Sequence, residues 1–307
     1  QMALLTIRGD ALAAALALTG VALAAARRPA WVVAVAFTLA FATKPTSLYA
    51  PTATLLWLLI CGERAAAGRI AWRTALGLLL LLAVMQVTSA GRALSVIGAS
   101  ASGGGTWRSL LFAPVALAHI LRRVPESLLF LMAAALAAFR ARPVFRGVER
   151  VAFGLCALAT LAIFASPATV ENHLVDLIAW SVIVIAAWAA RETRYVTFAM
   201  LVLLVGCLTA GATAATRWRD RDGLDARTAR EHALAAVTDA TGPVFVEQPM
   251  LAAKAGWQAY LVDPYLFSLR ITRDPQALDR LLDDLRQRRF SGVILEHAAL
   301  DLAVEDT

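Results

Sequence analysis

The chain has 307 residues, of which 60% are hydrophobic and 17% are charged, and its mean hydropathy is +0.67. A soluble domain cannot bury so many apolar side chains, so this composition excludes an ordinary soluble globular protein and favours a bundle that faces lipid. The formal net charge of +7 does not indicate nucleic-acid binding, because the arginines cluster beside apolar runs and not along one amphipathic face.

Eight apolar stretches extend as far as Ala215, and a more polar segment follows them. A span needs about 20 apolar residues, or fewer where it is broken or buried in a bundle. We therefore predict a mainly α-helical, polytopic membrane protein of about eight spans, with a helical bundle over residues 1–216 and a small α/β domain over 217–307. The predicted spans are 11–26, 30–43, 47–61, 74–88, 127–139, 151–166, 174–190 and 195–215.

The positive charges are divided unevenly between alternate loops. Eleven lie in one set (Arg27, Arg28, Arg64, Arg69, Arg73, Arg140, Arg142, Arg146, Arg150, Arg191 and Arg194) and six in the other (Arg8, Lys44, Arg92, Arg108, Arg122 and Arg123). The positive-inside rule predicts that the larger set is cytoplasmic. With eight spans in the plasma (inner) membrane, the N-terminus and the C-terminal domain are then extracytoplasmic. If one short span is two interfacial pieces, the C-terminal domain changes side.

The segment after residue 216 alternates helical and strand patterns. Helices are predicted over 223–241, 249–255 and 275–288, the last with Asp274 as its N-cap, and strands over 244–247, 259–262 and 292–295. This order predicts a small three-stranded parallel sheet. Glu247 and Asp263 end two of these strands, where parallel sheets bind ligands, but their proximity to proline favours ordinary turn residues.

Asp10 and Lys44 are charged residues beside apolar runs. Asp10 suits an N-cap of the first span, or a group that holds a metal or an acceptor hydroxyl. Lys44 lies in Thr43-Lys44-Pro45-Thr46, which predicts a break between two spans at one membrane face. It suits either a lysine that extends to the membrane surface or a cation that binds phosphate beside backbone N–H groups freed by the break.

A second polar group precedes the seventh span. His173 and Asp176 are three residues apart and share a helix face, and Asn172 precedes them. They could bind a hydroxylated substrate or a pyrophosphate, or they could be a helix cap beside an interfacial histidine. These residues do not make a metal site by themselves, and Cys61 and its two counterparts in other apolar runs show neither metal-ligand nor disulfide spacing.

The region between the fourth and fifth spans contains two further segments. The glycine-rich segment 98–105 lacks the Lys-Ser/Thr of a nucleotide-binding loop, which favours a flexible external loop that could cover a substrate. Residues 107–123 form a basic amphipathic segment, with Trp107, Phe112, His119, Arg122 and Arg123, that suits the headgroup plane of a membrane.

The order of these patterns resembles that of bacterial GT-C glycosyltransferases, which are distantly related to protein O-mannosyltransferases and lipid A aminoarabinose transferases. The resemblance rests on Arg-x-Asp at residues 8–10, Thr-Lys-Pro-Thr at 43–46, Glu-Asn-His-Leu-x-Asp at 171–176 and the phrases of the C-terminal domain. It covers most of the chain, although no single motif is specific.

The resemblance implies a transferase that moves a sugar from a polyprenyl-phosphate carrier to an acceptor on the extracytoplasmic face. It matches Asp10 to the family's second acidic residue, which we expect to be the catalytic carboxylate of this chain. It matches Lys44 to the basic residue of the family's helix break, and we expect Arg8, Lys44, Asn172, His173 and Asp176 to bind the substrate or carrier phosphate. The family's first external loop, which carries its expected base, is absent here, so we expect an N-terminally incomplete chain that could be inactive alone.

The expected partners are the lipid-linked sugar, membrane lipids and an acceptor that is a glycan, lipid or protein. No bound cofactor is indicated, and a requirement for a divalent metal is left open. The alternatives are a transporter or flippase for a lipid-linked or anionic substrate, with a broken helix at Lys44-Pro45, and a non-catalytic membrane assembly protein.

Overall fold

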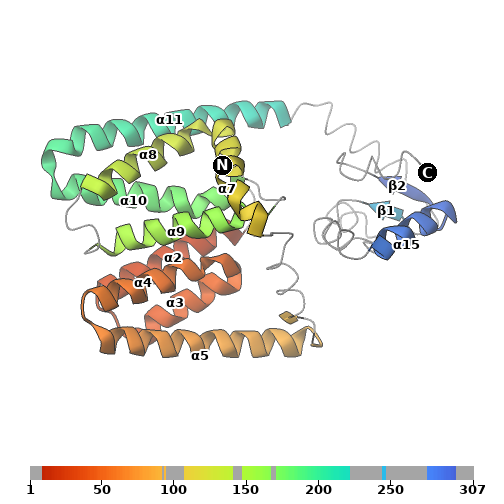
Figure 1. Cartoon of the computed structure of the whole chain (residues 1–307), viewed down its shortest axis with the longest axis horizontal. Coiled ribbons are helices and arrows are strands. Elements are labelled where there is room, and N and C mark those ends of the chain that lie inside the picture. Colours follow the sequence, from red (N-terminus) through yellow and green to blue (C-terminus); the bar gives the residue numbers. More distant parts are fainter. Residues whose placement is uncertain are drawn as a thin grey trace. The chain divides into compact units, whose positions relative to one another are not determined.

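A computed structural model describes residues 9–91, 93–94, 107–140, 147–166, 171–221, 244–246 and 275–294. The chain divides into one unit of Gln1–Gly98 with Gly105–Ala215, and a second of Ala99–Gly104 with Thr216–Thr307. The first is a bundle of helices, and the second contains the described strands (Figure 1). The division falls next to the boundary predicted after residue 216.

The described residues contain ten α-helices. Nine belong wholly or mainly to the first unit: α2 (Gly9–Ala25), α3 (Ala30–Thr43), α4 (Tyr49–Ile60), α5 (Arg64–Thr88), α7 (Trp107–Arg123), α8 (Pro125–Arg140), α9 (Val148–Ile163), α10 (Val175–Arg191) and α11 (Val196–Arg221). Short 3-10 helices precede three of them: η1 (Pro45–Leu48) before α4, η2 (Glu171–Leu174) before α10 and η3 (Thr193–Tyr195) before α11. Alanine and leucine, the strongest helix formers, dominate these segments.

The ends of three helices follow from local backbone chemistry. Pro45 keeps Lys44 extended, with φ −153° and ψ 107°, so α3 ends at Thr43. After α4, Gly62 has φ 80°, and the Glu63 amide donates to the Leu58 carbonyl at 2.8 Å. After α2, Arg27 has the same left-handed backbone conformation as Gly62, with φ 57°. This conformation is strained for a non-glycine residue.

Helix α10 connects two apolar cores of the bundle. It packs against α2, α8 and α9, while α3 packs against α2 and α5, and α4 against α9. The larger core joins residues of α2, α3, α4, α7 and α9 to the first half of α10, including Trp180. The smaller core joins α8 and α11 to the second half of α10, around Phe130 and Trp188. Figure 1 shows most of these helices side by side along one direction.

Each predicted span falls mainly in a helix, but the described helices do not support the expected count of about eight membrane spans. Only two helices of the described ranges are long and apolar enough to cross a membrane, Arg64–Thr88 with 25 residues and Thr193–Thr216 with 24. The helices from Gly9 to Ala25 and from Ala30 to Thr43 have 17 and 14 residues. At 1.5 Å per residue they extend roughly 21–26 Å, less than the ~30 Å hydrocarbon core. The Lys44-Pro45 break ends α3, and the turn at Gly62 ends α4 after 12 residues.

The second unit contains a parallel strand pair and one described helix. Strand β1 (Val244–Val246) pairs in parallel with β2 (Gly292–Ile294), with Phe245 opposite Val293. Helix α15 (Pro275–Arg286) precedes β2, and its Leu281 packs with Phe245, Leu285 and Phe290. The predicted strand 259–262, the predicted helices 223–241 and 249–255, and the residues Asp274, Glu247 and Asp263 lie outside the described residues.

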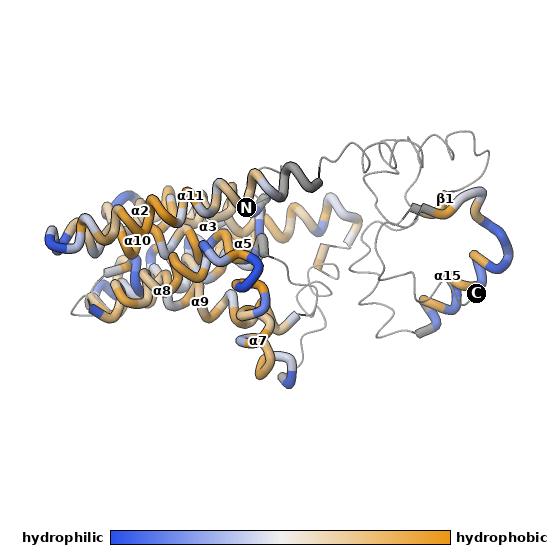
Figure 2. The backbone as a smooth tube through the Cα atoms, turned by 90° about the horizontal axis from the view of Figure 1, so that it is seen from above, coloured by the Kyte–Doolittle hydropathy of each residue, from blue (hydrophilic) through white to orange (hydrophobic). Residues whose placement is uncertain are grey.

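Figure 2 shows apolar residues along nearly the full length of the bundle helices, whereas α15 carries many hydrophilic ones. This difference follows the switch in composition near residue 216.

Candidate functional site

Three charged residues from distant parts of the sequence meet inside the bundle. Asp10 lies in the first turn of α2, Lys44 between α3 and η1, and Asp176 in the first turn of α10. All three therefore lie at the same end of the bundle. The N-terminal position of both aspartates in their helices favours their negative charge, because the helix dipole is positive there.

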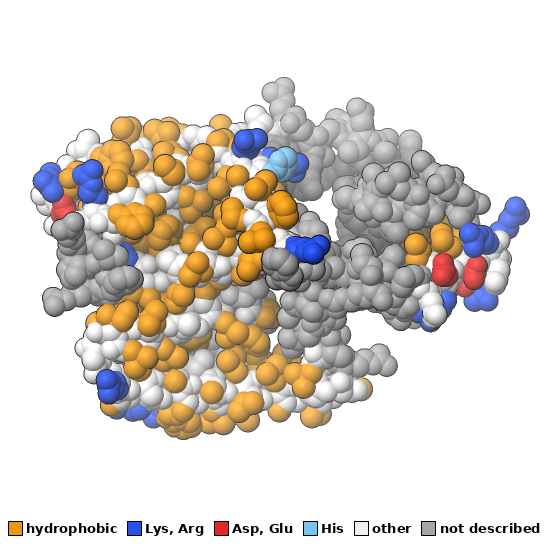
Figure 3. Space-filling model, in the orientation of Figure 1, with side chains coloured by type: hydrophobic (Ala, Val, Ile, Leu, Met, Phe, Trp, Pro, Cys, Tyr) orange, Lys and Arg blue, Asp and Glu red, His pale blue; other side chains and the backbone are white. Residues whose placement is uncertain are grey.

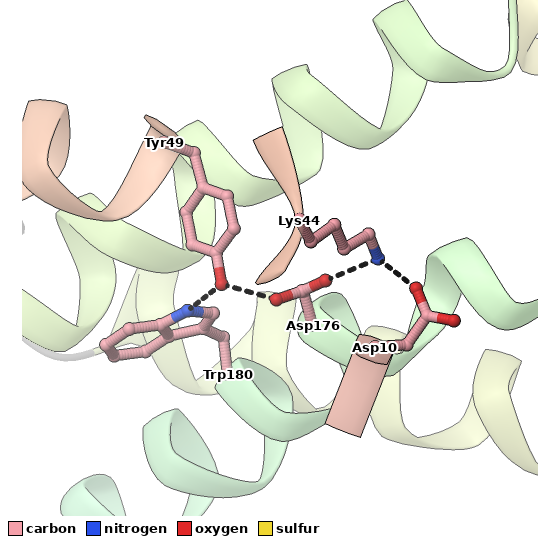
Figure 4. Close-up of polar contacts among 5 residues, drawn as sticks. All are labelled: Asp10, Lys44, Tyr49, Asp176 and Trp180. Atoms are coloured by element: carbon pink, nitrogen blue, oxygen red, sulfur yellow. Dashed lines mark hydrogen bonds and ion pairs between the residues drawn. The ribbon is translucent and has the colours of Figure 1, made fainter. Parts of the chain in front are cut away.

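Lys44 lies between the two carboxylates (Figure 4). Its Nζ is 2.9 Å from Oδ1 of Asp10 and 3.0 Å from Oδ2 of Asp176. The other Asp176 oxygen accepts a hydrogen bond of 2.8 Å from the Tyr49 hydroxyl, and Trp180 Nε1 donates to that hydroxyl at 3.2 Å. We call Asp10, Lys44, Tyr49, Asp176 and Trp180 the charged cluster. Lys44 thus links α2 to α10 at the point where α3 is broken.

The charged cluster is almost closed to solvent. Asp10, Lys44 and Asp176 are exposed by 9%, 8% and 5%. Burying such ions costs several kcal/mol each, and good mutual geometry offsets this only in part. One cation and two carboxylates meet here, so the formal charge of the cluster is negative.

The structure brings together three of the six residues predicted from the sequence: Asp10, Lys44 and Asp176. His173 is half-buried in η2, three residues before Asp176. Arg8 and the side chain of Asn172 lie outside the described residues.

Sequence reasoning missed Tyr49 and Trp180, the two aromatic members of the charged cluster. A signal for Trp180 was present, because it lies four residues after Asp176 and therefore on the same face of a helix. Tyr49 gives no such signal, because the helix break separates it from Lys44.

A different set of ion pairs lies at the opposite end of the bundle. Arg27, after α2, pairs with Glu63, before α5, and lies over the Trp57 ring with 4.9 Å from its Cζ to the ring centroid. Glu149 of α9 binds Arg191 at the end of α10, with 2.7 Å between Oε1 of Glu149 and Nη1 of Arg191. Each of these residues lies at or next to a helix end that is far from the charged cluster. Arginines of the larger predicted set therefore gather at the bundle end remote from Lys44.

Among the described residues, no group of three or more histidine, cysteine, aspartate and glutamate side chains is arranged to hold a metal ion. No protein-family model, curated protein or solved structure matches this chain.

Proposed function

We propose that the first unit is embedded in a membrane and that it acts as a glycosyltransferase of the GT-C type. The distribution of side-chain sizes supports the embedding. The most deeply buried residues are largely small, whereas many large apolar side chains face outward (Figure 3). Examples of the first kind, all 0% exposed, are Ala13, Ala17, Ala40, Ala50, Ala53, Ala134 and Ala152; examples of the second are Leu79, Val87, Phe139, Met200 and Leu208.

A soluble bundle has the reverse pattern, because water drives large apolar side chains inward. Helices in lipid instead pack through small residues that let their backbones approach. The two helices of membrane length agree with this reading, because only 11% and 17% of their apolar windows are buried within the protein. A core helix of a soluble protein would be mostly buried.

The arginines support one orientation of the embedded bundle. The end that carries Arg27 and Arg191 belongs to the more basic set of loops, which the positive-inside rule assigns to the cytoplasm. Figure 3 shows lysine and arginine side chains where α4 leads into α5 and where α10 leads into α11. The charged cluster then lies toward the extracytoplasmic face, where lipid-linked sugars are the expected donors.

The observation that carries the proposed activity is the convergence of Asp10, Lys44 and Asp176 at one buried point. Ionisable residues within a membrane are costly, so their presence favours a functional role over a purely structural one. We take the proposed chemistry, glycosyl transfer, from the order of sequence patterns, which resembles that of GT-C enzymes.

In the proposed reaction the phosphate of a polyprenyl-phosphate sugar competes with the carboxylates for Lys44. Lys44 then neutralises the charge that develops on the departing phosphate. Asp10, released from its ion pair, accepts the proton of the acceptor hydroxyl as that oxygen attacks the anomeric carbon and the carbon–phosphate oxygen bond breaks. Asp176, held by Tyr49, keeps Lys44 in position.

The test uses membranes that contain the full-length protein and supply their own acceptors. Polyprenyl-phosphate mannose, glucose, arabinose and aminoarabinose, each labelled in the sugar, are the donors, and the label that leaves the lipid is measured. Asp10→Asn should slow transfer by roughly 10²–10⁴-fold, as expected for loss of a general base. Glu149→Gln is the matched control, because Glu149 is also a buried, ion-paired carboxylate but lies at the other end of the bundle.

If Asp10→Asn transfers sugar at the wild-type rate per folded molecule, Asp10 is not the general base of the reaction. Failure of the wild-type protein to release sugar from every donor would contradict the glycosyltransferase proposal as a whole.

A transporter of lipid-linked or anionic substrates is the second candidate. It is favoured by the broken helix between α3 and η1, with a buried cation at the break. Non-helical backbone at membrane depth is tolerated where protein buries it or where it lines a path. Movement of an intact fluorescent polyprenyl-phosphate sugar between leaflets without sugar release, abolished by Asp10→Asn, would support this candidate over the enzyme.

A further inference from the structure

Helix α7 differs from its neighbours in the composition of its exposed face. Three large apolar side chains, Leu111, Phe112 and Val115, are 67%, 68% and 66% exposed. Arg108 precedes them, and exposed cations follow at Arg122 and Arg123. Nη2 of Arg123 also lies 3.0 Å from Nε2 of His119. The sequence of this helix contains no aspartate or glutamate.

The opposite face of α7 fixes the helix to the bundle. Ala113, Leu121 and the following Val124 are buried and belong to the larger apolar core. The helix packs against α8 and α9, and Val124 alone separates it from α8. Its exposed face is therefore held in a defined direction.

The direction of α7 also sets it apart. Figure 1 shows α7 running across the direction of α8, α9, α10 and α11, and Figure 2 shows it at the margin of the bundle. If those four helices cross or enter a membrane, a crosswise helix lies along the membrane plane. Helices in this position place apolar side chains below the headgroups and basic side chains among them.

We propose that α7 is an interfacial anchor that binds anionic phospholipid headgroups on the side of the bundle that carries the charged cluster. Leu111, Phe112 and Val115 enter the upper acyl region, and Arg108, Arg122 and Arg123 contact lipid phosphates. Charge complementarity selects this occupant, because three arginines with no acidic residue in the helix match a negative surface. The proposal rests on the membrane embedding argued above and fixes the depth at which the charged cluster lies.

The experiment measures how deeply three positions lie in lipid nanodiscs that contain the full chain. The exposed Cys61 and Cys207 are replaced by serine, and the buried Cys156 is kept. A spin label is then attached at Phe112→Cys in α7, at Leu79→Cys in α5 or at Arg280→Cys in α15. Collision rates with oxygen and with a water-soluble nickel chelate give the depth. Discs of phosphatidylcholine are compared with discs in which phosphatidylglycerol makes up roughly a third of the lipid.

The label at 112 should lie in the interface, shallower than at 79 and deeper than at 280, and phosphatidylglycerol should draw it inward. Arg108→Gln with Arg122→Gln and Arg123→Gln should abolish the effect of phosphatidylglycerol, because each arginine contributes about fivefold to binding an anionic surface. The matched control, Arg280→Gln with Arg286→Gln and Arg288→Gln, changes net charge equally in the second unit and should leave the effect intact.

Two results overturn this inference alone. One is a label at 112 that contacts water as freely as the label at 280 while the label at 79 is deep. The other is an interfacial label at 112 that responds to neither phosphatidylglycerol nor the arginine variants. A label at 79 that is itself in water would contradict the embedding, and with it the proposed function.

Discussion

Lys44 is the residue on which the charged cluster depends, because it is the cation between two buried carboxylates. Lys44→Met should lower the free energy of unfolding by about 3–5 kcal/mol, since it leaves two negative charges without their partner. Adding Asp10→Asn and Asp176→Asn to Lys44→Met should restore much of the loss. Thermal and denaturant unfolding of the full chain in detergent measures both. A triple variant less stable than Lys44→Met would show that charge imbalance is not the cause.

Tyr49 makes a smaller and separable contribution. Tyr49→Phe keeps the ring but removes the hydroxyl that donates to Asp176 and accepts from Trp180. The expected loss is about 1.5–3 kcal/mol, the usual value for a hydrogen bond to a charged group. Tyr195→Phe is the control, because the contacts of Tyr195 with Trp188 and Arg194 are made by its ring. Equal effects of the two substitutions in the same unfolding measurement would argue against a role for the Tyr49 hydroxyl.

The site residues that could be predicted from the sequence are charged residues, because the energetic cost of burying a charge makes them stand out in an apolar sequence. Asp10, Lys44 and Asp176 interrupt or border apolar runs, and a charge in that position needs a reason. Tyr49 and Trp180 are aromatic residues in apolar surroundings, where packing explains them equally well. The pairing of Lys44 with Asp10 and Asp176 depends on how α2, α3 and α10 pack, and hydropathy carries no information about that.

Where two helices pack closely, a glycine leaves room for a side chain of the neighbouring helix. Helix α11 contains one glycine at such a contact and one that is away from any contact. A Cβ at Gly206 would collide with the buried Phe130 ring of α8, whereas a Cβ at Gly211 would meet no atom within 4 Å. Gly206→Ala should therefore destabilise the bundle by about 1–3 kcal/mol. Gly211→Ala should be neutral or stabilise by up to about 1 kcal/mol, since it restricts the unfolded chain. Unfolding of both variants in detergent checks this, and a stabilising Gly206→Ala would contradict the close packing of α8 on α11.

At the scale of elements, hydropathy located helices better than it set their ends. The predicted span 30–43 matches α3, because the prolines at both of its ends stop the helix sharply. The predicted span 74–88 covers only the later part of α5, which begins at Arg64. Arginines lower the hydropathy of residues 64–73 without weakening the helix, since arginine is a good helix former. In the second unit, the predicted parallel direction of the first and last strands is confirmed by β1 and β2.

At the scale of the whole molecule, we predict that the C-terminal domain is extracytoplasmic. The more basic loops assign the end near Arg27 and Arg191 to the cytoplasm, and α11 runs from that end. A reporter that works only in the cytoplasm should therefore be silent when fused after Thr307. The same reporter placed between Arg191 and Thr193 should be active. Reversal of the two signals would invert the topology and place the charged cluster toward the cytoplasm.

The central claim, that the charged cluster is the reaction centre of a membrane glycosyltransferase, is tested most directly by Lys44→Gln in the full-length protein. Transfer of sugar from the polyprenyl-phosphate donor that the wild-type protein uses is measured per folded molecule. Loss of a cation that neutralises the departing phosphate should lower the rate by roughly 10²–10³-fold, or about 3–4 kcal/mol. A lysine kept only to reach the membrane surface would tolerate glutamine. A rate within about threefold of wild type, less than about 1 kcal/mol, would contradict the account.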